Sequence, residues 1–296
     1  MNKIIIALAV IMIAGLGVYF INKSPTKVVN PPESQNTTAT TTPIAKEENP
    51  SESIIGKSVE NRDIIAYHYG TGETELLFIG GIHGGYSWNT ALVAFELMDY
   101  LKASPNIIPK NIKVTVIPVL NPDGLNKVVG TAGRFTPSDV PSPISATVAG
   151  RFNANTVDLN RNFDCDWKAS GTWQSKTVSG GSRAFSEPET RAIKSYVELN
   201  KPDAVVTWYS AAGGVYASEC GKGISAETRA ITKEFADTSG YPAFDDFDFY
   251  EVTGDMVNWF AKNNIPAISV LLTNHTDTEW TKNQKGIQAL LKYYVK

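Results

Sequence analysis

The sequence predicts an α/β domain with a mixed, mostly parallel central sheet flanked by helices. Two observations carry this prediction. Apolar runs of strand length alternate along the chain with longer runs of helical period, which is the pattern of α/β domains. Polar residues stand at or near the ends of the strand-like runs, and in such sheets ligand sites form at the carboxyl ends of strands. The predicted strands are 75–81, 114–120, 204–208 and 267–272.

The helix-like runs occupy the intervals between and after these strands. They are predicted at 90–103, 187–200, 226–237, 255–263 and 281–294. The segment 125–185 follows neither period and is rich in glycine, serine, threonine and asparagine. A long irregular segment inside a compact domain usually carries a binding site.

The N-terminal region predicts attachment to a membrane. Residues 4–21 contain no charge, and at about 1.5 Å per residue a helix of this length just spans a bilayer core of roughly 30 Å. We expect a transmembrane signal anchor at 4–21, a cytoplasmic stub at 1–3 and an extracytoplasmic remainder. The alternative is a cleaved signal peptide and a secreted protein. Residues 22–53 are rich in threonine, serine, proline and glutamate, which predicts a disordered linker before a domain at 54–296.

Charge and cysteine content argue against two classes of site. The net charge of the 296 residues is −3 and no basic run occurs, so the sequence gives no indication of nucleic-acid binding. The two cysteines, Cys165 and Cys220, lack the spacing of a zinc-cysteine site. Outside the cytosol they are able to form one disulfide, and we expect this pairing because both flank the predicted cleft.

Five pieces of the sequence resemble the zinc carboxypeptidase family, the carboxypeptidase A-like peptidases, and occur in the family's order over most of 54–296. They are GGIHGG, VIPVLNPDG, RFNANTVDLNRNFD, VVTWYSAAGGVYAS and the run 250–280. The resemblance implies a zinc ion held by two histidines and a glutamate, with a second glutamate as general base on the zinc-bound water. Three protein ligands would leave one zinc position open for that water.

Carried over to this chain, the resemblance retains only part of that machinery. His83 matches the first zinc histidine. Ser87 stands at the expected glutamate position, with Tyr86 as the alternative, and Tyr209 stands at the second histidine. Leu271 replaces the general base and is unable to accept a proton. Hydroxyl groups are poor zinc ligands beside imidazole or carboxylate, so zinc, although expected of the family, should bind weakly or not at all.

No other histidine is a convincing substitute. The chain has two more, His68 and His275. His68 lies in a strand-like piece and is interpreted as structural, whereas His275 follows the last predicted strand.

The residues that the family uses to hold a peptide C-terminus are present. Asn160 and Arg161 match the pair that binds the terminal carboxylate, and Tyr250 matches the tyrosine that covers it. Arg151 matches the arginine that stabilises the oxyanion. Val257 takes the approximate place of the specificity residue, which indicates an apolar side-chain pocket. The alternative is that these polar groups form only a structural network.

The sequence therefore favours a membrane-tethered, catalytically inactive family member that binds the C-terminal carboxylates of peptides or cell-wall peptides. Two alternatives stay open. One is an active zinc metallocarboxypeptidase with non-standard ligands. The other is a structural surface domain that binds no ligand.

Overall fold

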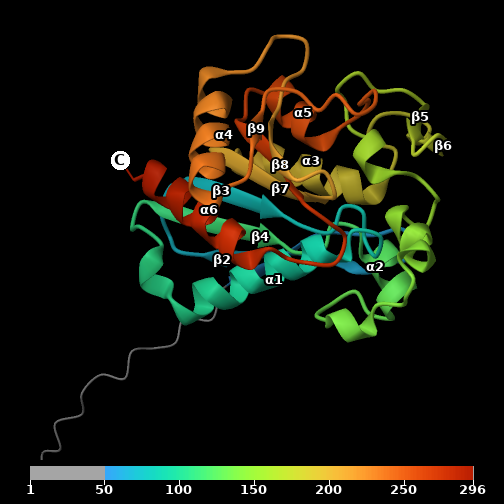
Figure 1. Cartoon of the computed structure of the whole chain (residues 1–296), viewed down its shortest axis with the longest axis horizontal. Coiled ribbons are helices and arrows are strands. Elements are labelled where there is room, and N and C mark those ends of the chain that lie inside the picture. The colour runs from blue at the N-terminus through green and yellow to red at the C-terminus, as the bar shows by residue number, and fades with distance from the viewer. Residues whose placement is uncertain (1–50, 296) are drawn as a thin grey trace, which may run out of the picture. The chain divides into compact units, whose positions relative to one another are not determined.

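The computed structural model describes residues 51–295, and these form one mixed sheet with helices on both faces (Figure 1). The sheet has eight strands in the order β1-β2-β4-β3-β7-β10-β8-β9, and β5 and β6 form a separate hairpin. The strands are β1 Ser51–Lys57, β2 Asp63–Tyr69, β3 Thr74–Ile79, β4 Ile112–Ile117, β5 Ser170–Trp173, β6 Lys176–Ser179, β7 Ala204–Ser210, β8 Gly214–Ala217, β9 Ala243–Phe244 and β10 Ala267–Leu272.

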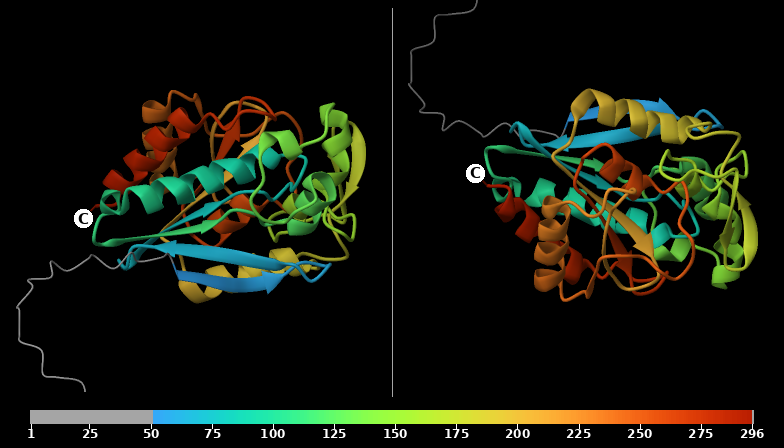
Figure 2. Two further views of the ribbon diagram at one scale, coloured as in Figure 1. Left: turned by 90° about the horizontal axis from the view of Figure 1, so that it is seen from below. Right: turned by 90° about the horizontal axis from the view of Figure 1, so that it is seen from above.

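The helices cover the two faces of this sheet, as Figure 2 shows. α1, α4 and α6 contribute to one hydrophobic core, whereas α3 and α5 contribute to the core on the opposite face. Their bounds are α1 Trp88–Ala103, α2 Pro122–Val129, α3 Pro188–Asn200, α4 Ala226–Ser239, α5 Met256–Lys262 and α6 Trp280–Tyr293. Short 3-10 helices are η1 Pro105–Ile107, η2 Pro137–Asp139, η3 Ile144–Arg151 and η4 Leu159–Arg161.

The predicted fold class is confirmed. β4, β3, β7 and β10 are parallel to one another in the middle of the sheet, and antiparallel pairs flank them. In β7 every residue except the last is buried, which explains its continuous apolar run: strands covered by helices on both faces need apolar side chains on both. The parallel arrangement brings the carboxyl ends of β3, β7 and β10 together at one edge.

The segment 125–185, predicted to be irregular, contains mainly short elements. It holds most of α2, the η2–η4 helices and the β5–β6 hairpin. Glycines let its backbone approach the rest of the domain closely. A Cβ atom at Gly124 would lie 2.4 Å from the Gly150 carbonyl oxygen, and a Cβ at Gly84 would lie 2.6 Å from the same atom. This packing places the loop that carries His83 directly against the segment that carries Arg151.

The folded domain begins earlier than the expected boundary at residue 54. Ser51, Glu52 and Ser53, assigned to the linker, pair with β2 as the first residues of β1. Strand pairing is made by backbone groups, so an exposed edge strand needs few apolar side chains, and composition alone missed it. The predicted anchor at 4–21 and most of the linker lie outside the described residues. Within residues 51–295, no helix is long and apolar enough to cross a membrane.

Candidate functional site

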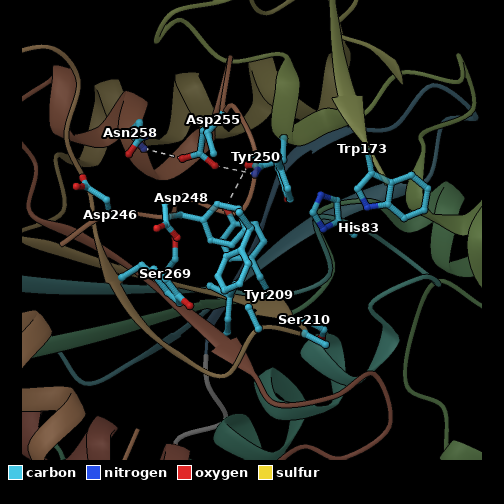
Figure 3. A pocket seen from close by; sticks show the side chains of 18 of the residues that line it. His83, Trp173, Tyr209, Ser210, Asp246, Asp248, Tyr250, Asp255, Asn258 and Ser269 are labelled. Atoms are coloured by element: carbon cyan, nitrogen blue, oxygen red, sulfur yellow. Dashed lines mark hydrogen bonds between the residues drawn. The ribbon is translucent and has the colours of Figure 1, made fainter. Parts of the chain in front are cut away.

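A cavity of about 840 Å³ lies at the carboxyl ends of the central strands (Figure 3). His83 enters it from the loop after β3. Tyr209 and Leu271 enter it from β7 and β10, where each is the last residue but one of its strand. Tyr209 and Leu271 are register partners on these two neighbouring parallel strands, so they lie side by side. Arg151, Asn160, Arg161 and Tyr250 also line the cavity. The structure therefore brings seven of the eight predicted positions together, and Ser87 is the exception.

Ser87 lies outside the cavity lining. It is buried at the start of α1, and its hydroxyl has no hydrogen-bond partner within the described part of the chain. Its neighbour Tyr86 points into the cavity instead. The Tyr86 ring packs 5.0 Å from the Trp173 ring and 4.6 Å from the His275 ring, between ring centroids. Of the two alternatives for the missing glutamate, the structure thus favours Tyr86.

His83 belongs to a buried polar cluster with Asp158 and Arg151. Its Nε2 lies 3.5 Å from Asp158 Oδ1, which is long for a hydrogen bond. Arg151 Nε donates a hydrogen bond to Asp158 Oδ2 at 3.0 Å, and Arg151 Nη2 forms an ion pair with the same oxygen at 2.8 Å. Burial, reinforced by the Arg151 charge, lowers the pKa of His83 to about 4, so the imidazole is neutral at physiological pH. Arg151 thus has an internal counter-ion.

Asp158 is charged although it is fully buried. Burial alone would raise the pKa of this carboxyl group, but the Arg151 guanidinium overrides that effect and holds the pKa well below its usual range. The sequence contained the signal for Asp158, because it opens the DLNRNF motif two residues before Asn160. Its partnership with His83 was nevertheless not predicted.

The donor atoms around His83 do not fit a zinc ion. The one carboxylate beside it, Asp158, is already paired with Arg151. Burial raises the pKa of Tyr209 well above its ordinary value, which keeps this phenol neutral and a poor ligand. Over residues 51–295, the only group of three histidine, cysteine, aspartate or glutamate ligand atoms close enough to share an ion is Cys165, Asp166 and Cys220.

That group is not a zinc site either, because its two sulfur atoms form a disulfide. Cys165 and Cys220 are joined with their Cα atoms 6.0 Å apart, which confirms the predicted pairing. A zinc ligand would have to be a thiolate, and a disulfide sulfur is not one.

Arg161 is a buried cation without a carboxylate partner. Its side chain is almost wholly buried, and it donates hydrogen bonds to the carbonyl oxygens of Thr172 at 3.1 Å, Glu251 at 3.4 Å and Thr253 at 3.5 Å. Its Nε has no partner, and no carboxylate of residues 51–295 lies within 4.0 Å of it. The Tyr250 ring covers the guanidinium at 5.3 Å.

Asn160, the other half of the predicted carboxylate-binding pair, has hydrogen bonds on both ends of its amide. Its Oδ1 accepts from the Tyr209 hydroxyl and from the Met256 backbone N–H, both at 3.1 Å. Its Nδ2 donates to Asp255 Oδ2 at 2.7 Å. The orientation of this amide is therefore fixed by three partners.

The wall of the cavity opposite His83 carries acidic side chains among aromatic and aliphatic ones. Val257 is buried in the hydrophobic core and does not line the cavity, so the prediction that it forms an apolar side-chain pocket there was wrong. Glu219, Asp246 and Asp248 line this wall, and none has an ion-pair partner within residues 51–295. The sequence did not identify these residues as a group, because they come from two loops far apart along the chain that only the fold brings together.

Comparisons with known proteins identify relatives of this chain. Residues 45–290 match the family model described as zinc carboxypeptidase. The chain is 29% identical to the zinc carboxypeptidase of Simulium vittatum over 156 residues, 50% of this chain and 49% of that protein. It is 32% identical to murein peptide amidase A of Vibrio campbellii (strain ATCC BAA-1116) over 141 residues, 44% of this chain and 53% of that protein. The chain spans about half the length of these curated relatives.

Solved structures show the same fold. Bovine thrombin-activatable fibrinolysis inhibitor, in complex with tick carboxypeptidase inhibitor, aligns with a TM-score of 0.64 at 15% identity, covering 83% of this chain and 88% of that one. The murein-tripeptide amidase of Escherichia coli O157 aligns with a TM-score of 0.59 at 20% identity, covering 88% of this chain and 100% of that one. At these identities the likeness extends to the fold alone.

Proposed function

The chain belongs to the zinc carboxypeptidase family, and we propose that it is a member that binds the C-terminal carboxylate of a peptide without hydrolysing the peptide bond. One observation carries this proposal: Arg161 presents a buried guanidinium without a carboxylate partner to the cavity, whereas the position of the general base is occupied by Leu271. A buried unpaired charge is costly, and a carboxylate that forms two parallel hydrogen bonds with the guanidinium would offset that cost.

Hydrolysis would need a group that activates water, and the cavity offers poor candidates. Leu271 has no titratable atom. His83 is a weak base, because burial lowers its pKa to about 4, and its Nε2 lies 3.5 Å from Asp158 Oδ1. Arg151, at the position expected to stabilise an oxyanion, is already paired with Asp158. The cavity thus lacks a good group for activating water. It retains Arg161, the group proposed to bind a carboxylate.

The acidic wall restricts which peptides suit the cavity. Glu219, Asp246 and Asp248 would repel an acidic terminal side chain and attract a cationic one at short range. We therefore propose a ligand with its carboxylate at Arg161 and an amino group toward this wall. Two of the relatives named above are murein peptide amidases, so cell-wall peptides are our first candidates for the natural ligand.

Calorimetric titration with hippuryl-lysine tests the proposal. We expect hippuryl-lysine to bind and the corresponding C-terminal amide to bind at least about tenfold more weakly, because the amide removes the charge that Arg161 would engage. Arg161→Gln should weaken hippuryl-lysine binding by at least about thirtyfold, since loss of one partner from a buried charge pair costs roughly 2 kcal/mol or more.

The matched control is Arg183→Gln, the same change at an arginine that does not line the cavity. It should leave the affinity for hippuryl-lysine unchanged. Equal binding of the acid and the amide, or an Arg161→Gln variant with normal affinity, would rule out carboxylate recognition. The structural-domain alternative would then be favoured.

We further propose that residues 4–21 anchor this domain to a membrane with residues 54–296 outside the cytosol. The uncharged run supports this proposal, and so does the Cys165–Cys220 disulfide, because disulfides persist chiefly in oxidising compartments. In intact cells, both cysteines should resist maleimide until a reductant is added. Free, reactive thiols in freshly lysed cells would contradict an extracytoplasmic location.

A further inference from the structure

The carboxylate subsite described above already holds a carboxylate of the protein itself. Asp255 Oδ2 lies 2.7 Å from Asn160 Nδ2, the amide donor that a peptide carboxylate is proposed to use together with Arg161. Figure 3 shows the Asp255 carboxylate facing the cavity beside Asn258, with its hydrogen bonds drawn as dashed lines. A ligand carboxylate that accepts from the second N–H of this amide would lie beside the Asp255 carboxylate.

Asp255 is held in this place from two sides. It is the N-cap residue of α5, and its Oδ1 accepts a hydrogen bond from the Asn258 backbone N–H at 2.8 Å. Its side chain is mostly buried. Swinging the carboxylate away would leave the Asn258 backbone N–H in the first turn of α5 without its cap. The Asn160 amide is also held in its orientation, because the Tyr209 hydroxyl and the Met256 backbone N–H donate hydrogen bonds to its oxygen.

We infer that Asp255 is a proton-operated gate on this subsite, so that a peptide carboxylate enters beside Asn160 and Arg161 together with one proton taken from solvent. The inference rests on the proposed function. Two ionised carboxylates at hydrogen-bond distance from one amide would repel each other in a buried site, and such pairs instead share a proton. The proton would sit on Asp255 Oδ2, which would then donate a hydrogen bond to the ligand carboxylate.

The other charged groups around Asp255 set the pH range in which a ligand carboxylate binds together with a proton. Burial has the largest effect and raises the pKa of Asp255 above its usual value. The hydrogen bonds from Asn258 and Asn160 and the charge of Arg161 favour the ionised form but do not offset burial. Tyr209 and Tyr250 face it and stay neutral, because burial raises their own pKa values.

The remaining titratable groups of the cavity also affect this pH range. They are the cluster of His83, Arg151 and Asp158, the imidazole of His275 beside Tyr86, the phenol of Tyr216, and the carboxylates of Asp166, Glu219, Asp245, Asp246 and Asp248. None of these groups makes a hydrogen bond to Asn160 Nδ2. Asp255 alone does so, and the exchange is therefore assigned to it.

The test is hippuryl-lysine titration of the whole protein at pH 7 in two buffers that differ in ionisation enthalpy. The difference in heat gives the number of protons taken up, and we expect close to one per peptide bound. The affinity should fall by up to about tenfold for each pH unit between pH 6 and pH 8, as linkage of one proton to binding requires.

Asp255→Asn should remove both effects. Its oxygen is able to keep the α5 cap, and its NH₂ group is able to donate to a ligand carboxylate as protonated Asp255 would. The NH₂ group no longer accepts from Asn160 Nδ2, which leaves that donor to the ligand. We expect no proton uptake, an affinity that does not change between pH 6 and pH 8, and tighter binding than the unmodified protein at pH 8. Asp237→Asn makes the same chemical change on the exposed side of α4 and should behave like the unmodified protein.

The possible outcomes separate the gate from the proposed function. Tight binding of hippuryl-lysine without proton uptake in the unmodified protein overturns the gate and leaves the proposed function standing; this measurement does not depend on any variant folding. Proton uptake that survives Asp255→Asn also overturns the gate, because another group then takes the proton. Absence of any binding overturns both.

Discussion

The purified protein is expected to carry no stoichiometric zinc and to release no lysine from hippuryl-lysine. The donor atoms around His83 lack the two further ligands that a zinc site needs, since Tyr86 and Tyr209 offer neutral phenols and Asp158 is paired with Arg151. The loss of a general base typically costs 10²–10⁴ in rate, and Leu271 is unable to replace it. Metal analysis and a lysine-release assay on one sample, with and without added zinc, measure both quantities.

A variant in which the expected zinc site is restored serves as the positive control. Tyr86→Glu, Tyr209→His and Leu271→Glu together restore the side-chain types that the family resemblance assigns to these positions. We expect this triple variant to bind zinc more tightly than the unmodified protein, since two of the three changes add a strong ligand. One zinc per chain in the unmodified protein, with turnover that a chelator abolishes, would falsify the inactive assignment and favour the active alternative.

Removal of the disulfide is expected to lower the free energy of unfolding by about 4 kcal/mol. Cys165 and Cys220 are 55 residues apart in sequence, and the loss of loop-closure entropy in the unfolded chain grows with that separation. The bridge links the long segment that carries Arg161 to the loop after β8 that carries Glu219. Urea unfolding of the Cys165→Ser/Cys220→Ser double variant measures the effect.

The double variant is used because a single substitution would leave a free thiol able to form other bonds. The unmodified protein treated with a reductant should show the same loss of stability as the double variant, which makes it the control. A loss below about 1 kcal/mol in both samples would mean that packing alone holds these two segments together, and that the unfolded chain gains little freedom when the bridge is removed.

The regular elements around the site were predicted because their local signals agree with their tertiary environment. The last strand, Ala267–Leu272, was predicted with its exact bounds, since it is a continuous apolar run enclosed between neighbours on both sides. The first strand was missed. Ser51–Lys57 pairs through its backbone at the edge of the sheet, where exposed polar side chains are tolerated and hydrophobicity gives no signal.

By itself, the sequence determined the fold class and the family, and it predicted, through the family resemblance, that Leu271 stands where a base is expected. The residues of a motif are close together along the chain, so the motif is recognisable from the sequence alone. Only the tertiary structure decided that Tyr86 rather than Ser87 faces the cavity, and that the Asn160 amide already binds Asp255, 95 residues further along the chain. A hydrogen bond between distant segments depends on where the whole sheet places their loops, and no local pattern encodes that distance.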